Sequence, residues 1–531
     1  MQQHTPAPPA QFNFAADLIA ANAARPNKVA LIDDALSLTY GQLAEQIKST
    51  AAGLLNAGLR REERVLLLMH DCSDWVVSFL GCLYAGVVPV AVNTLLTPED
   101  YAYMLQHSRA QAALVSGALV PALQGGMQLA SQNGGHEIKA IYVSRATADL
   151  PVSYRAWSTL LEAAPLSKPC PTYADEAAFW LYSSGSTGRP KGTVHTHANA
   201  FYTAELYGKG VLQITEKDVC FSAAKLFFAY GLGNGLSFPL AVGATVILMA
   251  ERPTPDAVFK RWKGQLAGMK SIKPTIFFGA PTGFAGMLAA PNLPAKNEVA
   301  LRMCSSAGEA LPADIGQRFE KHFGVQIIDG IGSTEMLHIF LSNQPGKVRY
   351  GTTGWAVPGY QVELRGEGGG AVPDGEPGEL YIQGPTAALM YWQNREKSRN
   401  TFQGEWTKSG DKYVKNSDGS YTYSGRSDDM LKVSGIYVSP FEVEATLVQH
   451  SAVLEAAVIG KEDHEGLTKT KAFVVLKDGH SATEEELKAF VKGLLAPYKY
   501  PRYIEFVREL PKTATGKIQR FKLRDLEASR H

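Results

Sequence analysis

The sequence predicts an α/β fold: a large N-terminal domain of mostly parallel sheets covered by helices, residues 1–426, and a small mobile α+β C-terminal domain, residues 427–531. The first observation is length, because 531 residues exceed what one hydrophobic core holds. The second is the alternation of Val- and Leu-rich runs with amphipathic stretches, which is typical of a parallel sheet covered on both faces. The third is a change of composition near residue 345, where Gly, Pro and alternating strands begin to dominate.

The first part of the chain has the pattern of alternating strands and helices. Thr39, with Gln42 three residues later, matches a capping box and predicts that a helix begins there. Pro98 stands at a first-turn position and predicts another helix start. A strand at 29–32 lies between the first two helices, which occupy the rest of 14–56. The other elements expected here are strands at 65–69, 87–92, 112–115 and 140–143 and a helix at 74–85.

The same pattern resumes in the middle of the chain and then changes. A turn-rich segment at 366–378 lies between two strand-like runs and predicts a β-hairpin tip. It belongs to a small β-barrel-like subdomain expected at about residues 345–425. Beyond it, a charged helix at 483–495 and two strands indicate an α+β domain. The strands expected over this part are 177–182, 245–249, 276–278, 303–306, 326–329, 361–364, 379–382, 453–459 and 471–476.

Composition and charge exclude several classes of function. The chain has 52 basic and 51 acidic residues, so its net charge of +1 gives no footprint for nucleic acid or an anionic membrane surface. Its five cysteines are scattered without a C-x-x-C pair, which argues against a disulfide framework or a zinc site and suits a reducing compartment. No apolar run approaches the roughly 18 residues of a membrane span, and the N-terminus lacks a secretory signal pattern. We therefore expect a cytoplasmic protein.

The stretch SSGSTGRPKG at 183–192 carries the strongest chemical signal. It follows an apolar run at 177–182 and precedes a second strand-like run at 193–197. Glycines and hydroxyls can present backbone N–H groups to an anion, and Lys191 adds a cation, so the stretch predicts a polyphosphate site. The P-loop pattern G-x-x-x-x-G-K-S/T fails, so we expect the loop to join two strands rather than begin a helix. An ordinary hairpin turn is the alternative.

Two further polar stretches directly follow predicted strands. They are SSAGEA at 305–310 and DGIGSTE at 329–335. In a parallel sheet both would lie at the carboxyl ends of strands, where ligands bind. Thr334 can offer a hydroxyl to a phosphate, and Glu335 can offer a carboxylate to Mg²⁺, which prefers oxygen ligands. A Gly-rich turn with a solvated glutamate is the alternative.

Polar stretches also occur near the end of the chain. Residues 408–411 read KSGD, and GRSDDMLKVSG follows at 425–435. An aspartate such as Asp411 accepts hydrogen bonds from a ribose diol well, and Arg426 could brace the same sugar. Residues 511–520, PKTATGKIQR, form a basic loop that contains glycine. Taken alone, each of these stretches is more typical of a solvated surface.

Together the motifs resemble the adenylate-forming superfamily, which contains acyl- and aryl-CoA synthetases, firefly luciferase and the adenylation domains of peptide synthetases. The phosphate-loop pattern is matched at 183–192, the hinge pattern at 425–435 and the terminal P-K-T-x-x-G-K pattern at 511–517. The resemblance covers essentially the whole chain. One departure is KSGD at 408–411, where the family usually has Arg-Thr-Gly-Asp; the aspartate is retained.

The resemblance implies a role at each matched position. Thr187 and Lys191 would hold the β- and γ-phosphates of ATP, and Asp411 would bind the ribose. Lys517 would reach from the small domain to the substrate carboxylate and the α-phosphate. The implied ATP-binding residues are Ser184, Thr187, Lys191, Gly308, Glu309, Asp329, Thr334, Asp411 and Arg426. The implied catalytic residues are Lys517, Thr334 and Glu335, of which Glu335 is also the position for the metal, Mg²⁺.

The resemblance further implies a small domain that rotates between two reactions. Asp428 would be the hinge, and Gly435 would line the tunnel for coenzyme A, the co-substrate. A carboxylate that attacks ATP brings negative charge against negative charge, so Mg²⁺ and a lysine supply most of the help. Attack of a thiol on the acyl-adenylate needs different neighbours, which a domain that swaps faces can provide.

The stretch KLFFAYGLG at 225–233 predicts the pocket for the acid, because it combines aromatic and small residues. An aromatic Phe228, where many relatives have His, fits a flat apolar ring along which Tyr230 could stack. The alternative is that these rings are simply core. Details at 221–235 and 330–340 resemble benzoate–CoA ligases more than fatty-acyl or acetyl-CoA synthetases. The implied substrate-binding residues are Phe228, Tyr230, Gly231, Ala307, Gly330, Ile331, His338 and Ile339.

The function expected from this resemblance is ligation of benzoate to CoA through benzoyl-adenylate, with release of AMP and pyrophosphate. A medium-chain acyl-CoA ligase, another aryl-CoA ligase and a stand-alone adenylation enzyme that loads a carrier protein stay open as alternatives. A nucleotide sensor is a non-enzymatic alternative, but it would not need Lys517. The expected partners are an aromatic carboxylate, ATP and CoA, with a homodimer as a candidate assembly and no nucleic acid or membrane.

Overall fold

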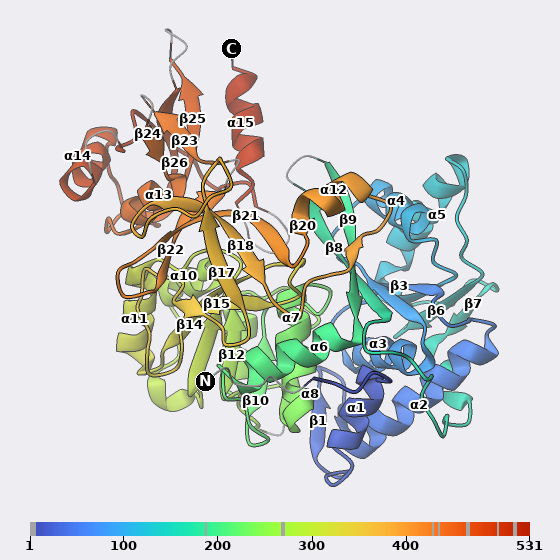
Figure 1. Cartoon of the computed structure of the whole chain (residues 1–531). Coiled ribbons are helices and arrows are strands. Elements are labelled where there is room, and N and C mark those ends of the chain that lie inside the picture. The colour runs from blue at the N-terminus through green and yellow to red at the C-terminus, as the bar shows by residue number, and fades with distance from the viewer. Residues whose placement is uncertain are drawn as a thin grey trace.

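The computed structural model describes residues 7–185, 188–266, 271–426, 429–433, 436–463, 468–495, 499–512 and 518–530. Figure 1 shows two α/β units side by side, a β-rich unit over them and a small lobe at the end of the chain. The parallel-rich α/β architecture predicted from the sequence is confirmed. The boundary at residue 426 stays a prediction.

The first α/β unit is built on a sheet with the strand order β19-β9-β8-β4-β3-β5-β6-β7. Its neighbours pair in parallel except at β8–β9 and β9–β19. The strands are β3 (Arg64–Leu68), β4 (Val88–Ala91), β5 (Ala112–Ser116), β6 (Ala140–Ser144), β7 (Tyr154–Ala156), β8 (Ala177–Gly185), β9 (Gly188–Thr196) and β19 (Met390–Tyr391). The helices of this part are α1 (Phe14–Ala21), α2 (Tyr40–Asn56), α3 (Ser73–Ala85), α4 (Pro98–Ser108), α5 (Val120–Gln132), α6 (His197–Thr203) and α12 (Arg395–Thr401).

The second α/β unit has the strand order β16-β15-β14-β13-β12-β10-β11-β1-β2. The strands from β14 to β1 are parallel, and the strands at both ends are antiparallel. The strands are β1 (Val29–Ile32), β2 (Ser37–Thr39), β10 (Val219–Ser222), β11 (Thr245–Ile247), β12 (Ile276–Gly279), β13 (Met303–Ser306), β14 (Ile327–Gly332), β15 (Ile339–Ser342) and β16 (Trp355–Ala356). The helices are α7 (Ala229–Leu232), α8 (Phe238–Val242), α9 (Pro255–Trp262), α10 (Pro281–Ala289) and α11 (Ala313–Phe323).

The remaining elements form the β-rich unit and the C-terminal lobe. The β-rich unit is an antiparallel sheet of β17 (Gln361–Arg365), β18 (Pro377–Gln383), β20 (Phe402–Gln403), β21 (Trp406–Lys415) and β22 (Tyr421–Arg426). The lobe contains β23 (Leu431–Val433), β24 (Ile436–Val438), β25 (Val453–Glu462), β26 (Thr468–Leu476), β27 (Tyr503–Phe506), α13 (Pro440–Val448), α14 (Glu484–Leu494) and α15 (Arg520–Ala528). The predicted hairpin tip lies between β17 and β18, which are antiparallel partners.

Local signals account for many of these elements. Thr39 accepts from the amide of Gln42 and Gln42 returns a bond to the amide of Thr39, so the predicted capping box is present at the start of α2. Elements without a predicted counterpart include β2, β7 and α5, and β19 falls inside the predicted β-rich subdomain. Met390 and Tyr391 instead pair with β9, because a two-residue strand takes its partner from tertiary packing.

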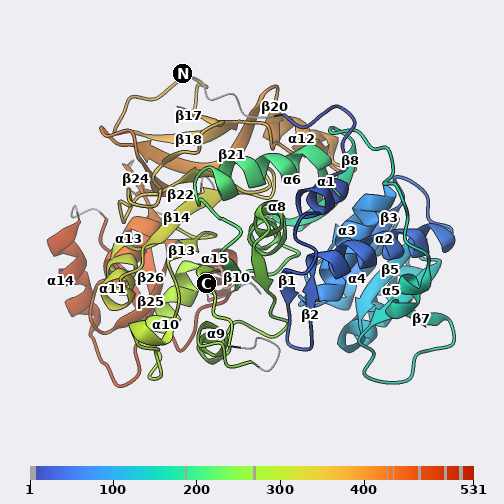
Figure 2. The ribbon, with the colours of Figure 1, turned by 90° about the horizontal axis from the view of Figure 1, so that it is seen from below.

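One core runs through both α/β units. A single cluster of buried apolar residues joins Leu67 and Trp75 of the first unit to Leu31 and Val246 of the second. Seen from below, α1, α6 and α8 lie between the two units (Figure 2). Because the two units share this core, they form one structural body.

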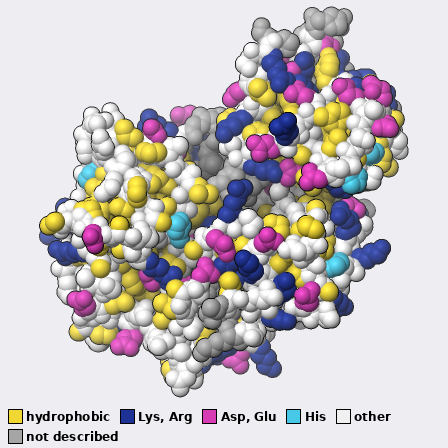
Figure 3. Space-filling model, turned by 180° about the vertical axis from the view of Figure 1, so that it is seen from behind, with side chains coloured by type: hydrophobic (Ala, Val, Ile, Leu, Met, Phe, Trp, Pro, Cys, Tyr) yellow, Lys and Arg dark blue, Asp and Glu magenta, His cyan; other side chains and the backbone are white. Residues whose placement is uncertain are grey.

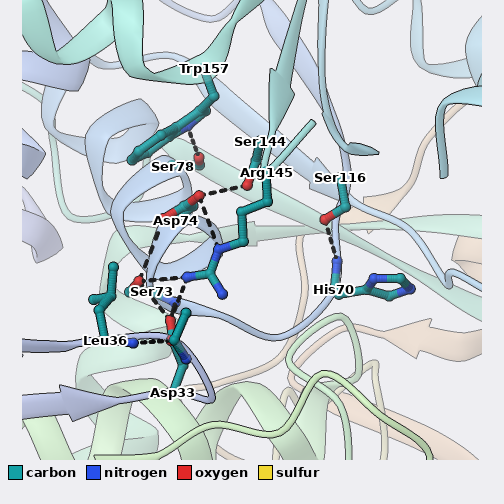
Figure 4. Close-up of polar contacts among 11 residues, drawn as sticks. Asp33, Leu36, His70, Ser73, Asp74, Ser78, Ser116, Ser144, Arg145 and Trp157 are labelled. Carbon is teal, nitrogen blue, oxygen red and sulfur yellow. Dashed lines mark hydrogen bonds and ion pairs between the residues drawn. The ribbon is translucent and has the colours of Figure 1, made fainter. Parts of the chain in front are cut away.

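A buried polar network also connects the two units (Figure 4). Asp33, which follows β1, accepts from Arg145 at 2.6 Å and from the Ser73 amide and hydroxyl at 2.9 and 2.8 Å. Asp74 accepts from Ser144 at 2.6 Å. Burial opposes the charge of Asp33, but the bonds from Arg145 and Ser73 outweigh it, and its pKa is lowered. The network therefore fixes the end of β1 against α3.

The surface shows no concentration of one charge on the face seen from behind, where basic and acidic side chains are mixed (Figure 3). In that view the C-terminal lobe stands at the upper right of the larger body. Among the residues that the structure describes, no helix is both long and apolar enough to cross a membrane.

Candidate functional site

A cleft of about 1340 Å³ lies at the carboxyl ends of β13 and β14 and continues under the C-terminal lobe. It brings together many side chains that the sequence analysis singled out from distant parts of the chain. The predicted residues that line it are Lys191, Gly308, Glu309, Asp329, Gly330, Ile331, Thr334, Glu335, Asp411 and Arg426. Thr187, Lys517, Asp428 and Gly435 lie outside the described residues, as does the side chain of Ser184.

The glycine-rich stretch joins β8 to β9, two antiparallel strands, as its failure to match a P-loop predicted. Ser183 and Lys191 are register partners on the two strands, so their side chains lie on the same face of the hairpin. The hairpin is held near its tip by α4, because the Tyr103 hydroxyl donates to the Pro190 carbonyl at 3.1 Å. One wall of the cleft is therefore a braced β-hairpin.

Lys191 and Glu335 face each other at the head of the cleft, with Nζ 3.7 Å from Oε1. Tyr391 donates its hydroxyl to the same oxygen at 2.6 Å, and Ser183 donates to it at 3.2 Å. Burial would raise the pKa of Glu335, but the attraction of Lys191 and these hydrogen bonds outweigh it, so the pKa is lowered. Burial lowers the pKa of Lys191, and the Glu335 carboxylate opposes that shift. The site thus contains an ionised carboxylate beside a lysine.

The residues present fit the binding of Mg²⁺ together with a polyphosphate. No group of three or more His, Cys, Asp or Glu side chains is arranged for a metal in the described part of the chain. Mg²⁺ usually takes one or two carboxylates and completes its shell with water and substrate phosphates. Glu335 supplies such a carboxylate, and Lys191 lies close enough to contact the same phosphates. One protein carboxylate is not enough to hold Mg²⁺, so the metal would bind together with the nucleotide, whose phosphates supply further ligands.

The loop that carries Thr334 and Glu335 is fixed from two sides. The imidazole of His195 contacts the Thr334 carbonyl at 2.8 Å through Nε2, and the Ala388 amide donates to the Glu335 carbonyl at 2.8 Å. Burial lowers the pKa of His195 to about 4, so the ring is neutral and donates to that carbonyl. The backbone of Thr334 and Glu335 is therefore held in place.

Asp329, one of the residues predicted to bind ATP, has an unsatisfied buried oxygen. Asp329 of β14 is the register partner of Ser306 on β13. Its Oδ1 has no hydrogen-bond partner among the described residues. Burial raises the pKa of Asp329 well above its ordinary value. Glu309 accepts from the Thr282 hydroxyl at 2.9 Å. A buried polar atom without a partner is costly, so this position suits a ligand with a polar edge.

The two residues predicted for the ribose lie on neighbouring strands. Asp411 of β21 and Arg426 of β22 are register partners, and the guanidinium lies 3.3 Å from Oδ1. Gly410 has a φ of +79°, and a Cβ there would lie 3.2 Å from the Arg426 guanidinium. The departure at Lys408 leaves this pair intact, since Lys408 turns to Glu379 at 3.8 Å.

The predicted acid pocket is only partly gathered in one place. Tyr230, Ala307, Ile331 and Ile339 belong to one apolar cluster, whereas Phe228 packs against a different cluster. Of the residues predicted for this pocket, Gly330 and Ile331 line the large cleft. The others, Phe228, Tyr230, Gly231, Ala307, His338 and Ile339, do not line it.

Tyr230 and His338 form the polar part of this region. The Tyr230 hydroxyl donates to Ser305 Oγ at 3.0 Å, so the ring is fixed rather than free to stack on any surface. The His338 ring lies 5.5 Å from the Tyr230 ring and its Nε2 lies 3.3 Å from the Tyr230 carbonyl. Burial lowers the pKa of His338 to about 3, so the imidazole is neutral.

Sequence reasoning missed several residues of the site. Tyr391 and His195 contact predicted residues, and Tyr103 and His107 line the same cleft, but the sequence around these four residues carries no motif. Ser183 lies inside the glycine-rich stretch, and its hydroxyl could have been included on that ground. The others become visible only when strands far apart in the chain are placed side by side.

Two protein families match the chain that forms this site. Residues 18–392 match the AMP-binding enzyme family, and residues 442–517 match the AMP-binding enzyme C-terminal domain. The chain belongs to the AMP-binding enzyme family. The resemblance to adenylate-forming enzymes is thereby confirmed, and the predicted boundary at residue 426 falls between the two matched ranges.

Individual relatives of this family are similar over nearly the whole chain. A benzoate–CoA ligase of Thauera aromatica is 54% identical, with 98% of each chain covered. A 4-hydroxybenzoate–CoA/benzoate–CoA ligase of Rhodopseudomonas palustris is 43% identical, covering 97% of this chain and 94% of the relative. The crystal structure of a benzoate CoA ligase from Burkholderia xenovorans LB400 superposes with a TM-score of 0.89 at 59% identity, covering 97% of this chain and all of that chain.

Proposed function

We propose that this protein is a benzoate–CoA ligase that activates benzoate with ATP and transfers the benzoyl group to coenzyme A. The observation that carries the proposal is 54% identity to a benzoate–CoA ligase over 98% of both chains. The cleft supports it, because Lys191, Glu335 and Asp411 line one space of a size that suits a nucleotide. The substrates are then a small aromatic carboxylate, ATP and CoA.

In the first step a benzoate oxygen attacks the α-phosphorus of ATP and the bond to pyrophosphate breaks. Lys191 and Thr187 hold the leaving phosphates, Asp411 holds the ribose, and Lys517 approaches the reacting carboxylate and α-phosphate. Glu335 would hold Mg²⁺, which neutralises charge on the phosphates when bound. In the second step the CoA sulfur attacks the benzoyl carbonyl of the adenylate, and AMP leaves.

The aromatic acid is assigned to the region around Tyr230 and Ile331. Tyr230 is held by Ser305, and the neutral His338 ring lies beside it, so the walls there are rigid and largely apolar. Such walls suit a flat ring that carries no charge away from its carboxylate. Small fluoro or amino substituents are expected to be tolerated, and bulky para groups are expected to be rejected.

The decisive assay is CoA-dependent AMP formation across a panel of aromatic and aliphatic acids. The proposal expects the highest kcat/KM with benzoate. Faster pyrophosphate exchange with octanoate than with benzoate would contradict the aromatic assignment. A Lys517→Ala variant should bind ATP but lose adenylation, whereas a nucleotide sensor would be indifferent to this change.

A further inference from the structure

Tyr391 lies where three segments of the cleft wall meet. It belongs to β19, which pairs with β9 two residues beyond Lys191. In the segment that leads into β19, the amide of Ala388 donates to the carbonyl of Glu335 at 2.8 Å. The strand is therefore attached to the strand of the lysine and to the loop of the glutamate at once.

The side chain of Tyr391 contacts both charged groups. Its hydroxyl donates to Glu335 Oε1 at 2.6 Å and lies 3.3 Å from Lys191 Nζ. The same ammonium lies 4.4 Å from the centre of the Tyr391 ring. Hydrogen bonds to a charged acceptor and cation–π contacts are strongest where water is excluded, and Tyr391 is only 3% exposed.

These contacts use one oxygen of Glu335. Tyr391 and Ser183 both donate to Oε1, and Lys191 approaches the same atom at 3.7 Å. Among the described residues, no side chain forms a hydrogen bond with the second oxygen of this carboxylate, Oε2. A carboxylate held in this way has a fixed plane and keeps one oxygen for a further ligand.

We propose that Tyr391 is a positioning residue that sets the affinity for Mg²⁺-ATP by holding Glu335 Oε1 and supporting Lys191 on its ring. The hydroxyl contacts both charged groups, and the Lys191 ammonium stays 3.7 Å from Glu335 Oε1, longer than a direct hydrogen-bonded ion pair. Without the hydroxyl, the Glu335 carboxylate turns toward Lys191 and forms a direct ion pair with it. Nucleotide binding then has to break this ion pair before either group reaches a phosphate or the metal. This inference rests on the proposed ATP-dependent function.

The test is a Tyr391→Phe variant, which keeps the ring and removes the hydroxyl. Calorimetric titration of Mg²⁺ at fixed ATP should show that half-saturation needs about 10-fold or more Mg²⁺ than in the wild type, the usual effect of losing a partner behind a metal ligand. Binding of ATP without Mg²⁺ should change much less. In steady state, the KM for ATP should rise while the KM for benzoate stays the same.

The matched control is Tyr360→Phe, which removes another buried tyrosine hydroxyl, bonded to Thr386 at 2.9 Å, away from the cleft. It should leave the Mg²⁺ titration unchanged. Wild-type Mg²⁺ dependence in a folded Tyr391→Phe variant would overturn the inference.

A second variant keeps the test decisive if Tyr391→Phe does not fold. Ser183→Ala removes the longer of the two hydroxyl bonds to Glu335 Oε1 and should shift the Mg²⁺ titration in the same direction by a smaller factor. An unshifted titration in that variant would then refute the inference. Failure of the wild-type protein itself to bind Mg²⁺-ATP would overturn the proposed function as well.

Discussion

At the residue scale, Lys225 fixes the loop that carries the predicted acid-pocket residues. Its ammonium donates to the carbonyls of Met249 and Glu251, the latter at 2.7 Å, beyond the end of β11. The next amide, of Leu226, is held by the buried carboxylate of Asp71 at 3.2 Å. The segment leading to Tyr230 is thus tied to two other loops.

A Lys225→Met variant should therefore raise the KM for benzoate several-fold. Methionine preserves much of the buried stem but loses the hydrogen bonds that hold the loop, each worth about 1.5–3 kcal/mol when the donor is charged. The KM for ATP should not change, because the phosphate hairpin lies elsewhere. CoA-dependent AMP formation at varied benzoate and varied ATP measures both. Lys217→Met, at an exposed lysine, is the control; an unchanged KM for benzoate in Lys225→Met would contradict this role.

Asp71 makes a pH-dependent contribution to stability. Burial raises its pKa from 3.8 to about 6, so between these values the folded protein holds a proton that the unfolded chain releases. The contribution of Asp71 to the free energy of unfolding is therefore highest below about pH 4, falls as the pH rises toward 6, and stays lower above it. The shift corresponds to about 3 kcal/mol.

An Asp71→Asn variant should remove this loss, because asparagine keeps an oxygen for the Leu226 amide but has no charge to bury. The gain in its free energy of unfolding over the wild type should grow between pH 4 and pH 6 and then level off. Denaturant unfolding at several pH values measures it. Parallel stability curves for the two proteins would show that the Asp71 carboxyl does not titrate in this range.

At the scale of single elements, α4 braces the phosphate hairpin. Nδ1 of His107 lies 2.9 Å from the Tyr182 hydroxyl on β8, and its Nε2 lies 3.2 Å from the carbonyl of Trp392 just after β19. Tyr103, one turn earlier, bonds Pro190 on β9. One helix face therefore contacts two strands, β8 and β9, and the segment that follows β19.

A His107→Ala variant should weaken this support. It leaves the partly buried Tyr182 hydroxyl without its partner, which costs about 1–3 kcal/mol, and it frees the hairpin to shift. The KM for ATP should rise several-fold with little change in the KM for benzoate. Steady-state kinetics with thermal unfolding measures both effects, and His480→Ala at an exposed histidine is the control. Equal increases in both KM values would point to general destabilisation instead.

At the scale of the whole molecule, the C-terminal lobe touches the large domain through aromatic side chains. Tyr423 of β22 and Phe441 of α13 pack edge to face with ring centres 5.3 Å apart. Ile518 and Gln519, directly after Lys517 in sequence, line the same cleft as Asp411. Residues 518 and 519 therefore lie on the side of the molecule that carries the predicted nucleotide site.

A Phe441→Ala variant should slow adenylate formation by roughly 2- to 10-fold, because an aromatic pair of this kind is worth about 0.5–1.5 kcal/mol. Transfer to CoA from preformed benzoyl-adenylate should change less, since that step is proposed to use another orientation of the lobe. Pyrophosphate exchange and single-turnover thioester formation separate the two steps. Phe506→Ala, at an exposed ring of the lobe, is the control; equal slowing of both steps would contradict the prediction.

By itself, the sequence determined the α/β class, the hairpin of the glycine-rich stretch and the family, because strand periodicity, turn residues and contiguous motifs are local signals. The same local signals are enough to place Lys191, Glu335 and Asp411 among the candidate residues. They could not place Tyr391, which is 200 residues from Lys191 and 56 from Glu335.

Only the tertiary structure decided how these residues meet. The pairing of β19 with β9 is set by packing of the whole sheet, since two residues carry too little preference of their own to choose a partner. The same holds for Phe228 and Tyr230, which are neighbours in sequence but pack into different cores. A side chain's partners depend on which segments, far apart in the sequence, pack together. The free energy that selects this packing is shared among many contacts and does not come from any one residue.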